Sequence, residues 1–213
     1  MDFCAVERFI TEWFWKYSRK NCQMEIHMAV TLRCTLRCKN CNMFIPYQHA
    51  THDFDLKNLE MNVDNFFHYV DYVYRFVLLG GEPLLHSGLK DLIHYIGEKY
   101  SEKIGKIVII TNGTIVPDEQ LLRILAEQNV EMKISDYTDQ VAYKDKIVML
   151  IKSLKKFEIP YMVNREMKWN DFGFPENPVS YTESNVREHM IQCGPICHGG
   201  VRTKSWTVMP EKR

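Results

Sequence analysis

Short apolar segments typical of strands alternate with amphipathic segments typical of helices through the middle of this chain. Five runs are rich in Val, Ile and Leu, and four other stretches place apolar residues three and four apart. Strands that alternate with helices of about 10–15 residues are the signature of βαβ units around a parallel sheet. The sequence therefore predicts an α/β fold with strands at residues 25–31, 75–79, 106–110, 130–134 and 159–163.

Each expected helix has an apolar face that can cover this sheet. Asn62 is the expected N-cap of the first helix, and Pro117 with Asp118 opens the third. Five strands are too few for a complete eight-stranded barrel, which needs about 250 residues, so an open or partial barrel is expected. The four apolar faces carry, in order, Val63, Phe66, Phe67 and Val70; Leu89, Leu92, Ile93 and Ile96; Leu121, Leu122 and Leu125; and Ile147, Leu150, Ile151 and Leu154.

Two less regular segments flank the expected core of residues 24–164. Apolar residues at helical spacing over residues 3–17 predict an N-terminal helical segment, residues 1–23, that packs on the core. Residues 165–213 are interrupted by Gly173, Pro175 and Pro178 and are expected to form a short, irregular C-terminal extension.

Charge and hydropathy limit the classes of partner. Lys plus Arg equals Asp plus Glu at 27 each, which gives no electrostatic reason to expect a nucleic acid or an anionic membrane as a partner. No apolar run approaches the 18 or so residues of a membrane span, and the N-terminus lacks the features of a signal peptide. A cytoplasmic protein is expected.

Three cysteines, Cys34, Cys38 and Cys41, have the spacing C-x3-C-x2-C directly after the first expected strand. Three thiolates this close can ligate three irons of a cubane cluster and leave the fourth iron free for a chelating ligand. A zinc site is the alternative, but zinc sites are normally closed by a fourth Cys or His at short spacing. The nearest His residues downstream, His49 and His52, lie beyond a segment that contains Pro46.

Polar residues and glycines follow the later strands. Ligands of open parallel sheets bind at the carboxyl ends of the strands, so these residues are candidates for one ligand site. Two adjacent glycines would let the backbone approach a ligand closely. The residues are Gly80, Gly81 and Glu82 in a GGEP sequence after the second strand, Thr111, Asn112 and Gly113 after the third, and Ser135 and Asp136 after the fourth.

The three-Cys spacing followed by GGEP resembles the radical S-adenosylmethionine (radical SAM) enzymes over residues 24–164. The resemblance implies a partial (β/α)6 barrel in which Cys34, Cys38 and Cys41 hold a 4Fe-4S cluster. It also implies that the GGEP segment recognises the methionine amino group of SAM, that Asn112 shapes the site, and that Ser135 and Asp136 contact the ribose. Family members often have an aromatic residue before the third Cys, where this chain has Asn40, so Asn40 or a neighbour such as Phe44 is expected to contact the adenine.

The resemblance also implies an activity that depends on cofactors rather than on protein acids and bases. The expected cofactors are the 4Fe-4S cluster and SAM, and the expected partners are a peptide or small-metabolite substrate and an electron donor such as flavodoxin or ferredoxin. The reaction would be reductive cleavage of SAM followed by removal of a hydrogen atom from the substrate. The alternatives are an activase of a glycyl-radical enzyme and a non-catalytic iron-sulfur or zinc redox protein.

A second cysteine pair, Cys193 and Cys197, lies near the C-terminus in the sequence QCGPICHGG. Such a pair resembles the start of an auxiliary iron-sulfur site in this superfamily. Two thiolates fall short of the usual three or four ligands, so structural or free thiols are the favoured interpretation.

Overall fold

The computed structural model describes residues 21–38, 41 and 43–165, and its centre is a five-stranded, fully parallel sheet. The strand order β1-β2-β3-β4-β5 follows the order of the chain, so each strand pairs with the next one in sequence. This arrangement confirms the predicted α/β fold with an open, partial barrel. The strands are β1 (Cys22–Thr31), β2 (Tyr72–Gly80), β3 (Ile104–Thr111), β4 (Glu131–Ser135) and β5 (Tyr161–Asn164).

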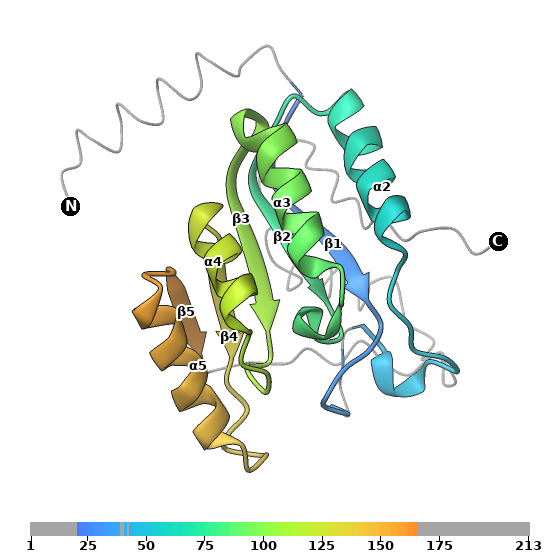
Figure 1. Ribbon diagram of the computed structural model, residues 1–213. Coiled ribbons are helices and arrows are strands. Elements are labelled where there is room, and N and C mark those ends of the chain that lie inside the picture. Colours follow the sequence, from blue (N-terminus) through green and yellow to red (C-terminus); the bar gives the residue numbers. More distant parts are fainter. Residues whose placement is uncertain (1–20, 39–40, 42, 166–213) are drawn as a thin grey trace, which may run out of the picture.

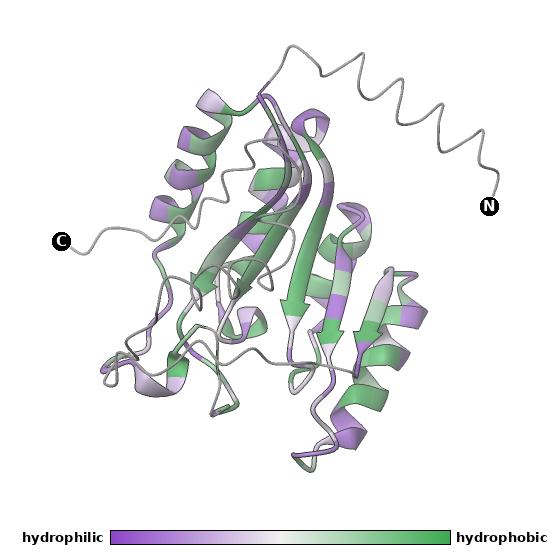
Figure 2. Ribbon diagram, turned by 180° about the vertical axis from the view of Figure 1, so that it is seen from behind, coloured by the Kyte–Doolittle hydropathy of each residue, from purple (hydrophilic) through white to green (hydrophobic). Residues whose placement is uncertain are grey.

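The α-helices that connect the strands all cover one face of the sheet (Figure 1). They are α2 (Leu56–Tyr69), α3 (Leu89–Tyr100), α4 (Glu119–Glu127) and α5 (Lys144–Lys156). Figure 2 shows the sheet from the opposite side, where the strands lie in front of the helices. Short 3-10 helices occur at Ile45–Tyr47 (η1), Pro83–Leu85 (η2) and Ser101–Lys103 (η3).

The main core lies between the sheet and these helices, as the alternation of side chains along each strand requires. On β1, Ile26, Met28 and Val30 belong to this core, so the residues between them face the other side of the sheet. The helices contribute the apolar residues that the sequence predicted. They are Val63 and Phe67 from α2, Leu89, Leu92, Ile93 and Ile96 from α3, Leu122 and Leu125 from α4, and Ile147, Leu150 and Leu154 from α5.

The prediction that Asn62 caps the first of these helices is wrong. Helix α2 begins at Leu56, and its N-cap is Asp55, whose carboxylate accepts a hydrogen bond from the backbone N–H of Asn58 at 3.1 Å. The first turns of α2 are mostly polar, but Leu59 is 1% exposed and anchors them to the core. The predicted start at Asp118 of the helix that is α4 is confirmed, because Asp118 accepts a hydrogen bond from the N–H of Leu121.

Several expectations concern segments outside the described residues. These are the N-terminal helix at residues 3–17, the adenine contact of Asn40, and the C-terminal extension that contains Cys193 and Cys197. In the part of the chain that the structure describes, no helix has the length and apolar character needed to cross a membrane.

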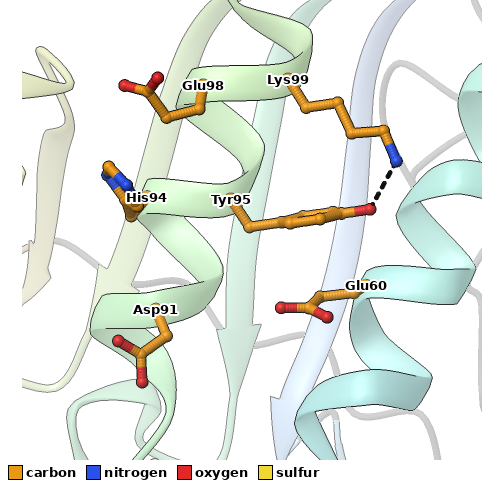
Figure 3. Close-up of a pocket in the computed structure, with 6 residues that line it drawn as sticks. All are labelled: Glu60, Asp91, His94, Tyr95, Glu98 and Lys99. Atoms are coloured by element: carbon orange, nitrogen blue, oxygen red, sulfur yellow. Dashed lines mark hydrogen bonds between the residues drawn. The ribbon is translucent and has the colours of Figure 1, made fainter.

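Helices α2 and α3 are joined by a hydrogen-bonded group centred on Asp64. The hydroxyls of Tyr95 and Tyr100 each donate to Oδ1 of Asp64 at 2.6 Å, and the Lys99 ammonium lies 2.9 Å from both carboxylate oxygens. Partial burial acts to raise the pKa of Asp64, but these three donors outweigh it and lower that pKa to about 2. Figure 3 shows Tyr95 and Lys99 beside an open pocket of about 500 Å³, also lined by Glu60, Asp91, His94 and Glu98.

Asp64→Asn is expected to destabilise the fold in a pH-dependent way. Because the folded state lowers the pKa of Asp64 below its ordinary value of 3.8, the stabilising effect of the carboxylate is present above that value and is lost as the pH falls toward 2. The loss at pH 6 should be about 1 kcal/mol, since the group is partly exposed. Urea denaturation of wild type and variant at pH 6 and pH 3 measures this difference.

The matched control for this experiment is Asp139→Asn in the exposed turn after β4, because Asp139 forms no hydrogen bond or ion pair with another described residue and lies outside the helices. This control should leave the free energy of unfolding nearly unchanged at both pH values. A destabilisation by Asp64→Asn that is equal at pH 6 and pH 3 would show that the carboxylate charge is not the cause.

Candidate active site

The carboxyl edge of the sheet, where Thr31, Gly80, Thr111, Ser135 and Asn164 end the five strands, brings most of the predicted site residues together. Residues 32–38, which we call the Cys segment, leave this edge directly after β1. Asp53, which lies shortly before α2, holds the start of the Cys segment in place. Thr31 donates a hydrogen bond to Asp53 at 2.6 Å, and the Arg33 guanidinium pairs with the same carboxylate at 2.9 Å.

Gly80 and Gly81 provide the space in which the Cys segment packs against the end of β2. Gly80 has a φ of +153°, and a Cβ there would lie 2.3 Å from the carbonyl oxygen of Thr31. A Cβ on Gly81 would lie 2.1 Å from the carbonyl oxygen of Arg33 and 2.9 Å from Cβ of Cys34. The backbone N–H of Gly81 donates a hydrogen bond to the carbonyl oxygen of Thr31 at 2.9 Å. The absence of side chains at the two glycines therefore lets the end of β2 pack against the Cys segment.

Glu82 is fully buried at the carboxyl edge, where its carboxylate joins two strands. The hydroxyl of Thr111 donates to Oε1 at 2.8 Å, and the backbone N–H of Asn112 donates to Oε2 at 2.8 Å. A third donor, the N–H of Leu84, lies 3.2 Å from Oε1. Burial raises the pKa of Glu82 to about 7 even though these three donors act to lower it. The backbone N–H of Glu82 in turn donates to Arg33 at 2.8 Å, so this residue connects β3 to the Cys segment.

Asn112 connects the end of β3 to the first cysteine. Its side-chain amide donates to the hydroxyl of Thr35 at 3.0 Å and lies 3.6 Å from Sγ of Cys34. Its side-chain oxygen accepts from the backbone N–H and the hydroxyl of Thr114, at 3.0 and 2.7 Å. The hydroxyl of Tyr143 donates to the carbonyl oxygen of Asn112 at 2.9 Å. Asn112 therefore orients the Cys34 side of the site through bonds within the protein.

Ser135 and Asp136 lie at the end of β4, next to the end of β3. The register pairs Thr111 with Ile134, and Ser135 and Asp136 are both buried. Burial acts to raise the pKa of Asp136, but the hydroxyl of Thr138, the backbone N–H of Thr138 at 2.9 Å and the nearby Arg165 outweigh it, so this pKa lies below its ordinary value. The Asp136 carboxylate is thus ionised and already engaged by Arg165 at 3.1 Å.

The three cysteines of the motif are partly buried, and their donor set fits an iron-sulfur cluster. Burial raises the pKa of the Cys34 thiol, and the backbone N–H of Leu36, 3.5 Å from Sγ, acts to lower it. Glu82 and the other two thiols raise this pKa further. Across residues 21–38, 41 and 43–165, no three His, Cys, Asp or Glu side chains converge closely enough to hold a metal ion. The fit therefore rests on the chemistry of three thiols and on the N–H groups directed at one of them.

Sequence reasoning missed several residues that build this site. Thr31, Thr35, Thr114 and Tyr143 connect segments that are far apart in the chain, as in the hydroxyl contact of 2.5 Å between Thr35 and Thr114. For Thr35 and Thr114, nearness to motif residues was the available signal, because Thr35 directly follows Cys34 and Thr114 follows Thr111–Gly113.

Comparison with known proteins gives one family match. The profile of the Radical SAM superfamily matches residues 28–158, which is more than half of the chain. No match was found among curated proteins.

Two solved structures with a similar fold are anSMEcpe with bound AdoMet (SAM) and Streptococcus suis SuiB bound to the precursor peptide SuiA. The first is 18% identical with a TM-score of 0.54, and the similarity covers 66% of this chain and 43% of that one. The second is 18% identical with a TM-score of 0.53, and the similarity covers 87% of this chain and 40% of that one. The chain therefore spans about two fifths of the length of these structures.

Proposed function

The chain belongs to the radical SAM superfamily, and we propose that it is an enzyme that cleaves SAM reductively and removes a hydrogen atom from a peptide or a small metabolite. One observation carries the proposal above all. Cys34 lies at the carboxyl edge of the sheet beside Gly81 and is contacted by Asn112, so the motifs that define the resemblance meet in space.

Cys34, Cys38 and Cys41 would hold a 4Fe-4S cluster, with SAM at its open iron. When bound, these groups supply the radical chemistry, and the protein residues orient them and exclude water. Glu82 and Asn112 would fix the GGEP segment and the Cys segment relative to each other. Gly80 and Gly81 would bring the backbone near the methionine part of SAM, Ser135 and Asp136 would contact its ribose, and Asn40 its adenine.

We propose two substrate classes. The two structures with a similar fold include one in complex with a precursor peptide, which supports a peptide as one of the two proposed substrate classes. A small metabolite is the other. The electron would come from a donor such as flavodoxin or ferredoxin.

The proposed function is tested by anaerobic reconstitution of the protein with iron and sulfide, followed by incubation with SAM and dithionite. Chromatography should detect 5'-deoxyadenosine, the product of reductive cleavage and hydrogen transfer. Candidate substrates are then ranked by how much they increase its formation. A reconstituted protein that binds iron and sulfide but forms no 5'-deoxyadenosine would contradict the proposal.

Iron counting separates one cluster from two. If Cys193 and Cys197 do not complete an auxiliary cluster, the reconstituted wild type should bind about four irons, the content of one cubane. Replacing both by Ala should leave this content and SAM cleavage unchanged. A wild type with about eight irons that falls to about four in the variant would show that the pair ligates a second cluster.

A further inference from the structure

Ionisable residues from four neighbouring strands lie on the face of the sheet opposite the helices. The alternation of side chains places them there, because the residues between them belong to the core on the helix side. They are Glu25 and His27 on β1, Arg75 on β2, Lys106 on β3, and Glu131 and Lys133 on β4.

The acidic residues of this face each have a basic partner. Glu25 pairs with His27 at 2.6 Å and with Arg75 at 2.5 Å. Glu131 pairs with Lys106 at 3.0 Å. The charges of both carboxylates are thus balanced by basic residues on β1, β2 and β3.

Among the described residues of this face, Lys133 is a cation beyond those that pair with Glu25 and Glu131. It is partly buried, and it forms no hydrogen bond or ion pair with any other residue that the structure describes. Its charge acts on Glu25, whose pKa it helps to lower, after the larger effects of His27 and Arg75. Glu25 is already paired with His27 and Arg75. Because no described carboxylate forms an ion pair with this partly buried ammonium, an anion at Lys133 would be favourable.

Lys133 lies on the same face of β4 as Ser135, a residue of the candidate SAM site, but farther from the carboxyl edge of the sheet. Lys133 is two residues before Ser135 on β4, which is about 7 Å along a strand. Its register neighbours are Ile110 on β3 and Met162 on β5. Met162 is 57% exposed, so the sheet is accessible to solvent beside Lys133.

We infer that the Lys133 ammonium binds an oxyanion of the substrate, a carboxylate or a phosphate, and thereby selects acidic substrates. This inference rests on the proposed function, because that function places SAM at the carboxyl edge above Lys133. A substrate anchored by its anion at this depth directs its remaining atoms toward that edge. The apolar side chain of Ile110 beside Lys133 strengthens the attraction, since fewer waters compete for the charge.

Titration calorimetry of the reconstituted, SAM-loaded protein tests the inference with two probes, glutarate and inorganic phosphate. At least one probe should bind the wild type with saturation, and the preferred probe identifies carboxylate or phosphate as the natural group. Lys133→Met keeps most of the length of the unbranched side chain but removes the charge, and it should weaken binding about tenfold or more. Lys133→Arg should retain affinity within a few-fold, because it keeps the charge.

The matched control is Lys152→Met, because Lys152 lies exposed on α5, on the helix side of the sheet. Binding of both probes should be unchanged in this variant. The inference is overturned if the wild type binds neither probe, or if Lys133→Met binds them as the wild type does. SAM cleavage by the wild type is measured separately, so a protein that binds a probe through Lys133 but cleaves no SAM would contradict only the proposed function.

Discussion

Replacing Cys34, Cys38 and Cys41 together with Ala is expected to abolish SAM cleavage by the reconstituted protein. The three thiols are the proposed ligands of the cluster, and no electron can reach SAM without it. The brown chromophore should disappear from the variant, unless an auxiliary cluster contributes part of it. Visible absorbance, iron content and formation of 5'-deoxyadenosine measure the three effects.

Cys22→Ala is the control for this experiment. Cys22 is the first residue of β1, at the opposite end of the strand from the Cys segment, and is also a partly buried cysteine. Its replacement should preserve the chromophore and SAM cleavage. A triple variant that still cleaves SAM reductively would contradict the assignment of the cluster ligands.

The sheet could be predicted from the sequence because its strands are short apolar runs between helices with clear apolar faces. Ile107 and Ile109, for example, are apolar because they are buried in the core on the helix side, and such residues in a short run indicate a strand. The start of α2 could not be predicted in the same way. Its first turns depend on the cap at Asp55 and on the single buried Leu59, and a periodicity of apolar residues gives little weight to either.

The candidate site could be predicted as a set of residues but not as a set of contacts. The order of the motifs placed Gly81, Glu82 and Asn112 at one edge, and the structure confirms that they meet the Cys segment there. Their partners lie far away in the chain, as between Asn112 and Thr35, and pattern reasoning gives no distance between such residues. The sequence interpretation therefore assigned the space at the two glycines to a ligand, whereas Thr31 and Arg33 approach them in the structure.

Glu82→Ala is expected to reduce both stability and SAM affinity. The substitution leaves the Thr111 hydroxyl and the N–H groups of Asn112 and Leu84 without their acceptor in a buried position. The free energy of unfolding should fall by about 2–4 kcal/mol, and SAM affinity by roughly tenfold to a hundredfold. Denaturant titration and calorimetry with SAM measure the two quantities.

Glu82→Gln separates a contact with SAM from a positioning role. The glutamine oxygen can still accept from Thr111 and Leu84, but its NH2 group meets the N–H of Asn112, so only part of the stability should be lost. If the charge of Glu82 binds the SAM amino group, Glu82→Gln should lose as much SAM affinity as Glu82→Ala while it keeps more stability. If Glu82 only positions the GGEP and Cys segments, SAM affinity should follow stability across the two variants. SAM binding that is unchanged in both variants would exclude Glu82 from the site in either role.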